Sequence, residues 1–584
     1  MKQILFLQLP LLDNDTSTQR ENFPFAGLWL SHALSQHPEG DFWEVVTAPA
    51  EWDELDNAHL VQEILASGIE AVAFTLCLWN VERSLRIARQ LKESRPELFL
   101  MAGGPEISED HPFLLEGPVF NALVTGEGES VFPEILKGIR TGKMPAYDNV
   151  LISSSEGWKK GSKPPPQIDL ASVQIPVTML QECIKVRPSV YVETSRGCPL
   201  TCTYCRYHHL QKGVRALPAE AAAQRVQQLR AAGAKDIRFV DPTFNARADF
   251  TRLLELLAKI NADRKLGFFA ELRADTLTPE QAELMAAANF LDVEIGVQST
   301  DPKVLRAIRR PANIAQIERG IRLLTGAGVK VTLDLMYGLP EQTMDDVLRS
   351  IEWARGLGPN INIQCMQTLL LPGTDLREQA EQYGVKAMPL PPYGVFSTST
   401  MSEEEMTRIE VLLHDSADLP ADPVTACFTG YRLNGLFKEQ VGTAVPAVRS
   451  SEKLKTGGLR QTALPLYSET LRGFQNRRAL LFRGGDLNAR RKEICQTIDR
   501  LIAGEPDMLW QFVLCPEREE PIQLLEAMIE TIKKQPPHLL DRYASAELFG
   551  QIASRRIFVR LQKGREYDAA WREEVEELLG RHFV

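Results

Sequence analysis

Short apolar runs alternate with helical patterns along the first 150 residues of the chain. The runs that have the length of buried strands are residues 4–8, 43–47, 71–75, 98–102 and 122–125. Residues 81–94, between two of these runs, have apolar positions at helical spacing. The alternation predicts a doubly wound α/β domain with a parallel sheet over residues 1–150. Ligands of such a sheet bind beside the carboxyl ends of its strands, so the residues just after each run are candidate binding residues.

The same alternation returns with longer spacing over residues 189–400. The predicted strands are residues 190–193, 237–240, 268–271, 293–297, 331–336 and 362–368. The helical patterns that separate them are residues 218–232, 248–260, 279–288, 314–326 and 344–356. Six β/α units joined by right-handed crossovers predict a partial, TIM-like (β/α)6 barrel, with ligands again at the carboxyl ends of the strands.

Two further segments differ in composition from these domains. Residues 151–188 are rich in serine, lysine and proline, which is typical of a linker. Residues 401–584 combine predicted strands at 508–513 and 557–561 with helical patterns at 522–533 and 570–579. We interpret this segment as an α+β C-terminal substrate or accessory domain. The charged run 477–491 within it is interpreted as a solvent-exposed face.

Composition limits the class of protein. A chain of 584 residues with 44% hydrophobic content is too long for one core and fits a globular multidomain protein. The formal net charge of −11 disfavours a nucleic-acid-binding function. No apolar run reaches the roughly 18 to 20 residues of a membrane span. Residues 4–12 are apolar but are followed at once by Asp13, Asn14 and Asp15, so a buried strand is favoured over a signal peptide, and a cytoplasmic location is expected.

Three cysteines lie close together in the predicted loop after the first barrel strand. Cys198, Cys202 and Cys205 have the spacing C-x3-C-x2-C. A [4Fe–4S] cluster is normally held by four thiolates, so three would leave one iron open. A structural zinc site would need a fourth Cys or His, and no second cysteine pair follows, although His208 and His209 are near. A disulfide framework is disfavoured because nine cysteines in the chain are few and fit a reducing cytosol.

The residues around these cysteines add to the pattern. Arg196 and Gly197 precede the first cysteine, and Tyr204 precedes the last. With them the loop resembles that of the radical S-adenosylmethionine (SAM) superfamily. The resemblance implies that Cys198, Cys202 and Cys205 ligate a [4Fe–4S] cluster, and that the open iron binds SAM and cleaves it to a 5′-deoxyadenosyl radical. Tyr204 is then a cofactor-binding candidate, and the two histidines are loop polar groups or substrate contacts.

Four loops of the first domain are candidate binding loops because they follow predicted strands. They contain Leu9, Pro10; Thr75, Leu76, Cys77, Leu78, Trp79, Asn80; Gly103, Gly104, Pro105, Glu106; and Gly126, Glu127, Gly128, Glu129. Glycine at such positions lets the backbone approach a large flat ligand closely. Each loop alone is also a common strand-to-helix turn. In this order they resemble the Rossmann-like cobalamin-binding domain that precedes the radical domain in one large subclass.

The resemblance has implications for the cobalt. The Asp-x-His-x-x-Gly motif that places a histidine on cobalt in other cobalamin enzymes does not occur around any histidine of this domain. A lower cobalt face without histidine is therefore expected, with Leu76, Cys77 and Leu78 as candidates to face the metal. Trp79 either lines the binding site or fills the core, and the core is favoured.

The predicted barrel strands end in polar residues suited to SAM. Glu271 and Arg273 lie two apart, so on a strand they face the same side and offer a carboxylate and a guanidinium. A buried ion pair between them is the alternative. Gln298 suits a ribose or substrate hydrogen bond or is a satisfied interior amide. Asp241 follows the second strand, where the superfamily binds the cofactor amino group. The order resembles the cobalamin-dependent radical SAM family over residues 1–400.

The resemblance implies a function that uses both cofactors. We expect methylation of an unactivated carbon, with methylcobalamin as methyl donor and a 5′-deoxyadenosyl radical generated at the cluster. Radical ring closure, ring contraction or oxidation is the alternative, and a non-catalytic cobalamin or iron–sulfur sensor is a third possibility. A tRNA methylthiotransferase is disfavoured by the acidic charge and by the lack of a second cysteine trio upstream. The expected partners are a small-molecule or peptide substrate and an external electron donor such as flavodoxin or ferredoxin.

Overall fold

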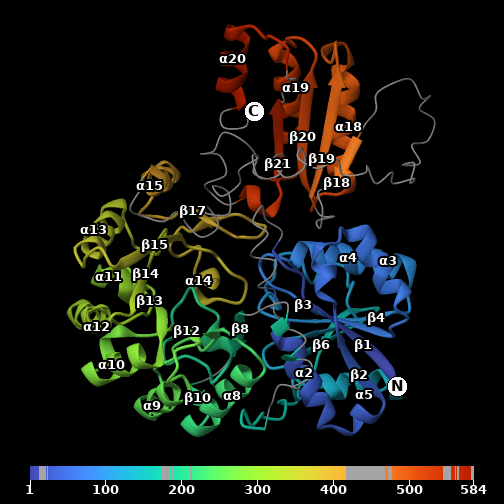
Figure 1. Cartoon of the computed structure of the whole chain (residues 1–584). Helices are drawn as coiled ribbons and strands as arrows, with labels where there is room; N and C mark the ends of the chain where they lie inside the picture. The colour runs from blue at the N-terminus through green and yellow to red at the C-terminus, as the bar shows by residue number, and fades with distance from the viewer. Residues whose placement is uncertain are drawn as a thin grey trace. The chain divides into compact units, whose positions relative to one another are not determined.

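The computed structural model divides the chain into two compact units. It describes residues 1–11, 22, 24–172, 180, 181, 184, 185, 189–210, 213–415, 467–470, 477–542, 554–559, 561 and 564–579. The described residues up to 415 form the first unit, except residues 54–57, which group with the second unit, and the second unit holds those from 467 onward. The predicted segments 1–150 and 189–400 therefore pack into one unit (Figure 1).

The first sheet has seven strands in the order β2-β1-β3-β4-β5-β6-β7. Its five parallel strands are β1 (Lys2–Leu7), β2 (Trp43–Thr47), β3 (Ala71–Thr75), β4 (Phe99–Gly103) and β5 (Ala122–Val124). Its helices are α2 (Phe25–Ser35), α3 (Asn57–Ala66), α4 (Val81–Ser94) and α5 (Phe132–Thr141). The predicted doubly wound fold is confirmed, because the apolar runs that predicted β1 and β3 are buried between helices.

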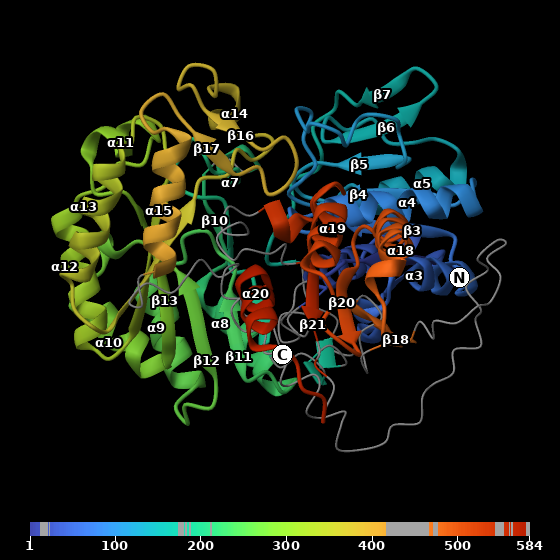
Figure 2. The same ribbon diagram turned by 90° about the horizontal axis from the view of Figure 1, so that it is seen from above.

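The linker predicted from residue 151 is wrong over its first ten residues. Strands β6 (Val150–Ser154) and β7 (Gly157–Lys160) form a hairpin that continues the first sheet, with β6 antiparallel to β5 (Figure 2). The hairpin ends the sheet, so much of it faces water, and its serines and lysines suit that position. Its polar composition therefore resembled that of a linker.

The second sheet is the predicted partial barrel. Its strand order is β15-β14-β13-β12-β11-β8, all parallel, and β8 and β15 are its edges. The strands are β8 (Ser189–Val192), β11 (Asp236–Phe239), β12 (Gly267–Glu271), β13 (Phe290–Gln298), β14 (Lys330–Tyr337) and β15 (Ile361–Gln367). The helices along their outer side are α8 (Ala219–Ala231), α9 (Phe250–Ile260), α10 (Pro279–Ala288), α12 (Ile314–Gly326) and α13 (Met344–Arg355) (Figure 1). Each predicted strand and helix of this region is confirmed.

The end of the barrel lies beyond the predicted boundary at residue 400. Helix α15 (Glu403–Asp415) buries Met406 and Ile409 in the barrel core, so it belongs to the first unit. A helix that covers the core of its neighbour is not visible from composition alone. Part of the predicted domain 401–584, residues 416–466, lies outside the described residues.

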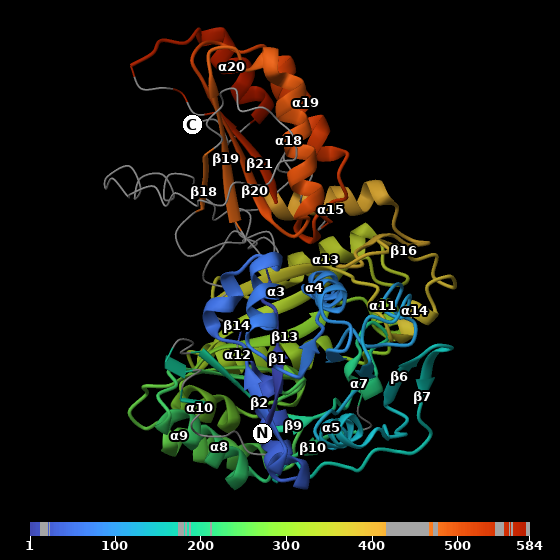
Figure 3. The ribbon, with the colours of Figure 1, turned by 90° about the vertical axis from the view of Figure 1, so that its right-hand side faces the viewer.

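The second unit has a four-stranded sheet in the order β18-β19-β20-β21 (Figure 3). Its elements are β18 (Tyr467–Thr470), β19 (Arg477–Gly484), α18 (Arg491–Gly504), β20 (Leu509–Pro516), α19 (Ile522–Lys533), β21 (Arg555–Val559) and α20 (Ala569–Leu579). The interpretation of residues 477–491 as a solvent-exposed face is wrong for β19. This strand lies between two others and buries Leu480 and Phe482, because its arginines flank a short apolar run.

No helix in the described part of the chain has the length and apolar character needed to span a membrane.

Candidate active site

The three cysteines of the C-x3-C-x2-C loop line one cavity at the carboxyl ends of the barrel strands. The cavity has a volume of about 170 Å³. The loop folds back on itself, since Cys205 N–H donates to the Cys202 carbonyl (3.1 Å), and it is held to the barrel by Thr203 N–H, which donates to the Ile308 carbonyl (3.0 Å). Among the cysteines that the structure describes, only Cys198, Cys202 and Cys205 line this cavity. The site therefore offers three thiols, as a cluster with one open iron requires.

The environment of the thiols suits a metal cluster. Leu200 N–H lies 3.5 Å from Cys198 Sγ, and a guanidinium nitrogen of Arg310 lies 3.5 Å from Cys202 Sγ. Donors around the sulfurs stabilise ligating thiolates. Burial raises the pKa of Cys205 to about 11, so this thiol keeps its proton at neutral pH until a metal displaces it.

Asp241 supports this loop and does not line the cavity. Its buried carboxylate accepts hydrogen bonds from Thr194 N–H (2.7 Å), Ser195 N–H (3.0 Å) and the Thr194 hydroxyl. These bonds fix the start of the cysteine loop at the end of β8. The structure therefore gives Asp241 the role of positioning the loop, whereas the sequence suggested contact with the cofactor amino group.

Tyr204, Glu271, Arg273 and Gln298 line the same cavity as the cysteines. Arg273 pairs with Asp275, so the alternative of an ion pair between Glu271 and Arg273 is not observed. Gln298 is 9% exposed, and its amide oxygen has no hydrogen-bond partner among the described residues. A buried amide oxygen without a partner is costly. Gln298 is therefore not a satisfied interior amide, and its oxygen is available to a ligand.

Two functional side chains of this cavity are absent from the sequence-based candidates. Glu294 on β13 lies four residues before Gln298 on the same face of the strand, a spacing that could have identified it. Arg310 follows the short helix α11 (Pro302–Ala307) and not a strand. A search for polar residues at the ends of strands therefore does not find it. Its guanidinium donates to the Gly296 carbonyl and to Cys202 Sγ. Arg310 thus connects the cysteine loop to the barrel.

Acidic side chains dominate this cavity. Desolvation within the barrel mouth and the charge of Glu294 raise the pKa of Glu271 to about 7, although its side chain faces the cavity. Burial, followed by a hydrogen bond with Glu294 and its charge, raises the pKa of Asp334 to about 10. Asp334 therefore stays protonated at neutral pH, whereas ionised Glu271 can bind a cationic group and Arg310 can bind a carboxylate.

A larger cavity of about 440 Å³ lies at the carboxyl ends of the first-sheet strands. The predicted residues that line it are Thr75, Gly103, Gly104, Gly126, Glu127, Gly128 and Glu129. A Cβ on Gly104 would lie 2.5 Å from the Leu76 carbonyl oxygen, and its φ of +109° also requires glycine. Aromatic residues on the other side of this cavity, which the sequence did not indicate, are Phe6, Phe25, Trp29, Phe74 and Phe132. A wide cavity with a glycine backbone rim and aromatic walls fits a large flat cofactor.

The other predicted residues of these loops lie outside that cavity. They are Leu9, Pro10, Leu76, Cys77, Leu78, Trp79, Asn80, Pro105 and Glu106. Asn80 joins two loops, because its oxygen accepts from Cys77 N–H (2.8 Å) and its amide donates to the Leu9 carbonyl (2.9 Å). Glu106 accepts from the Tyr393 hydroxyl (2.9 Å) and pairs with His111 (3.0 Å). Trp79 is 42% exposed, so the interpretation of Trp79 as a core residue is wrong.

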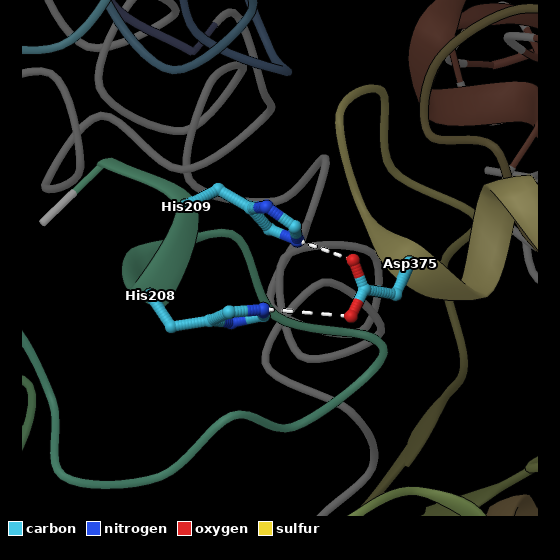
Figure 4. Close-up of side chains that lie close together, drawn as sticks. All are labelled: His208, His209 and Asp375. Atoms are coloured by element: carbon cyan, nitrogen blue, oxygen red, sulfur yellow. Dashed lines mark ion pairs between the residues drawn. The ribbon is translucent and has the colours of Figure 1, made fainter. Parts of the chain in front are cut away.

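His208 and His209 point toward a third side chain, Asp375 (Figure 4). The distances are 2.7 Å from His209 Nε2 and 3.6 Å from His208 Nε2 to the carboxylate oxygens. Three such groups can hold a metal ion, but Arg309 also pairs with this carboxylate. The charge of Asp375 is therefore already balanced. The group ties the short helix α7 (Tyr207–Leu210) to the segment after β15, as expected for polar groups of a loop.

The fold and the two cavities define a class: a cysteine-ligated cluster enzyme with a partial barrel and an adjoining α/β cofactor domain. Comparisons with known families agree with that class. Residues 192–354 match the radical SAM superfamily, and residues 28–136 match the B12 binding domain. The chain thus combines a radical SAM domain with a B12 binding domain. Its cofactors are a [4Fe–4S] cluster, SAM and cobalamin.

Several individual relatives and solved structures similar to this chain are methyltransferases. The chain is 25% identical over 338 residues to an uncharacterized methyltransferase of Pyrococcus horikoshii, covering 56% of this chain and 72% of that protein. It is 25% identical over 394 residues to the cobalamin-dependent radical SAM methyltransferase TokK of Streptomyces tokunonensis, covering 63% of this chain and 57% of TokK. The structure of the methyltransferase TsrM from Kitasatospora setae, with cobalamin and a [4Fe–4S] cluster bound, has a TM-score of 0.55 and 17% identity and covers 70% of this chain and 81% of TsrM.

Proposed function

We propose that this enzyme transfers a methyl group to an unactivated carbon of a small-molecule or peptide substrate. The observation that carries the proposal is that the two cofactor cavities share a wall. Tyr207 and Pro242 line both the cavity of the cysteines and the cavity of the first sheet. A substrate at this wall is adjacent to both cofactors. When bound, cobalamin supplies a methyl group, and the cluster with SAM supplies a radical that activates the acceptor carbon.

The side chains of the barrel cavity have distinct roles in this proposal. Cys198, Cys202 and Cys205 hold the cluster and leave one iron for SAM. Arg310 binds the SAM carboxylate, and the acidic group of Glu271 and Glu294 binds its cationic part. Gln298 donates to or accepts from the ribose hydroxyls.

The rest of the cavity wall controls solvent and substrate. Tyr207 lines both cavities, and about half of its surface is exposed. Burial and the charge of Glu271 raise the pKa of Tyr207, so the phenol stays protonated and can donate a hydrogen bond to a substrate.

The similarity to two methyltransferases, the protein of Pyrococcus horikoshii and TokK, supports methylation over ring closure. The external reductant is proposed to be a flavodoxin- or ferredoxin-like protein, since the cluster needs one electron for each SAM cleavage. A cytoplasmic location fits the need of such a cluster for a reducing compartment.

The test is anaerobic reconstitution followed by product analysis. The reconstituted enzyme, methyl-labelled SAM and a chemical reductant are incubated with a metabolite extract, and the products are analysed by mass spectrometry. Methylation predicts 5′-deoxyadenosine, S-adenosylhomocysteine and a product heavier by one labelled methyl group. A product without the label, formed with 5′-deoxyadenosine alone, contradicts methyl transfer and supports ring closure or oxidation.

The control for this experiment is the Cys202→Ala variant. Removal of one of three sulfur ligands is expected to abolish cluster assembly, visible as loss of its absorption, and with it the formation of 5′-deoxyadenosine. Continued 5′-deoxyadenosine formation by this variant would contradict the assignment of Cys202 as a cluster ligand.

A further inference from the structure

The cysteine loop is bonded directly to two loops of the first domain. Arg196, two residues before Cys198, pairs with Glu127 (2.8 Å) and with Glu129. Arg206, the residue after Cys205, donates to the carbonyls of Pro105 and Ile107. The loop that carries the three thiols is therefore held at both ends by the glycine-rich loops of the other cofactor domain.

The Arg196 contacts are shielded from water. The side chain of Arg196 is 12% exposed, and those of Glu127 and Glu129 are 19% and 9% exposed. Glu193 at the end of β8 also pairs with Arg196 (2.9 Å), and Arg215 pairs with Glu127. Partly buried, charge-assisted bonds of this kind are stronger than surface ion pairs and fix geometry as well.

The same network faces the larger cavity. Arg196, Glu127, Glu129 and Glu193 all line the cavity at the carboxyl ends of the first sheet. A ligand in that cavity therefore contacts the side chains that hold the start of the cysteine loop. The network lies close to the cysteines, since only Gly197 separates Arg196 from Cys198.

We propose that Arg196, with Glu127 and Glu129, couples the occupancy of the two cofactor sites, so that cobalamin and the [4Fe–4S] cluster each strengthen the binding of the other. The inference rests on the cofactors of the proposed function and adds positioning residues to it. Each cofactor orders one side of the shared ion-pair network. The second cofactor then finds its loop already ordered and loses less conformational entropy on binding.

The test compares cobalamin affinity with and without the cluster. Equilibrium dialysis of hydroxocobalamin against full-length protein is carried out anaerobically, once with the reconstituted cluster and once after its removal by a chelator. The cluster-loaded protein is expected to bind hydroxocobalamin about 5-fold to 50-fold more tightly, within the usual range of coupling between two sites. By reciprocity, cobalamin is expected to slow the loss of the cluster to the chelator.

Two variants separate coupling from general damage. Arg196→Lys keeps the charge but loses the two-pronged contact, and Glu129→Gln removes one acceptor from a loop that is distant in sequence from the cysteines. Each is expected to reduce the affinity ratio between the two forms to less than about 2-fold, and the double variant is expected to add little more, because both remove one interaction. Arg322→Lys, on the exposed helical pair with Glu318, is the matched control and should keep the full ratio.

The ratio is informative because a merely structural defect lowers both affinities and leaves it unchanged. Equal affinities of the two wild-type forms, or a ratio that survives both substitutions, would overturn the coupling. If Arg196→Lys fails to assemble a cluster, Glu129→Gln supplies the comparison. Failure of the cluster-loaded wild-type protein to bind hydroxocobalamin is a different result, because it would contradict the proposed function itself.

Discussion

Replacement of Arg310 by Gln is expected to lower the reduction potential of the cluster. A guanidinium nitrogen of Arg310 lies 3.5 Å from Cys202 Sγ. It is held in place by its second bond to the Gly296 carbonyl. A positive charge and a hydrogen bond beside a ligating sulfur favour the reduced cluster, which carries one more negative charge. Removal of both therefore makes reduction less favourable.

The size of the effect follows from the observed distance. Two unit charges 3.5 Å apart interact by about 5 kcal/mol at an effective dielectric constant of about 20. The added electron is spread over the whole cluster, so we take about one quarter of this energy, roughly 1.2 kcal/mol, as the difference between the two oxidation states. For a one-electron couple, about 1.4 kcal/mol corresponds to 59 mV. The expected decrease is therefore about 50 mV.

The assay is a redox titration of the reconstituted full-length enzyme, followed by electron paramagnetic resonance of the reduced cluster. Arg310→Lys keeps the charge but not the forked geometry and is expected to shift the potential by less than half as much. Arg322→Gln, which removes an exposed arginine of α12, is the control and should cause no shift. A change of less than about 10 mV in Arg310→Gln, or an equal change in the control, would refute the electrostatic reasoning.

Two further predictions concern the two cavities. Because the pKa of Glu271 is raised to about 7 and a bound cation favours its ionised form, SAM affinity of the cluster-loaded enzyme should rise up to about tenfold per pH unit below 7 and level off above it. Glu271→Gln should flatten this profile in a binding titration, and an unchanged slope in the variant would exclude Glu271. Gly104→Ala places a Cβ 2.5 Å from the Leu76 carbonyl oxygen and should lower the unfolding free energy by about 1 to 3 kcal/mol and weaken cobalamin binding. Gly142→Ala, where φ is also positive but nothing lies within 4 Å, is the control for backbone strain alone and should leave cobalamin binding intact.

The elements of the first unit could be predicted because their signal is local. The helix 81–94 and the barrel helices 279–288 and 314–326 have apolar positions at helical spacing, and the structure gives them the same limits. The strands are continuous apolar runs because both of their faces are buried. The hairpin of β6 and β7 was missed because an edge with one wet face lacks that signal.

The roles of polar side chains depend on partners far away in the sequence. Asn80 donates to the Leu9 carbonyl, 71 residues earlier, and Glu106 accepts from Tyr393, 287 residues later. A motif identifies the loop but does not say whether such a side chain faces a ligand or another loop. Arg310 was missed for the same reason, because its partner Cys202 lies 108 residues before it.

The charges of the barrel cavity indicate which kind of ligand it can bind. Asp334 and Glu294 lie side by side, and the pKa of Asp334 at about 10 means that the pair holds one proton at neutral pH, because two adjacent buried carboxyls do not both ionise. The pair then contributes one negative charge, and Glu271, with a pKa of about 7, contributes about half of another. Arg310 faces them with one positive charge. A ligand with two cationic groups and one carboxylate matches both sides of this cavity, and SAM, with its sulfonium, ammonium and carboxylate, has that set of charges.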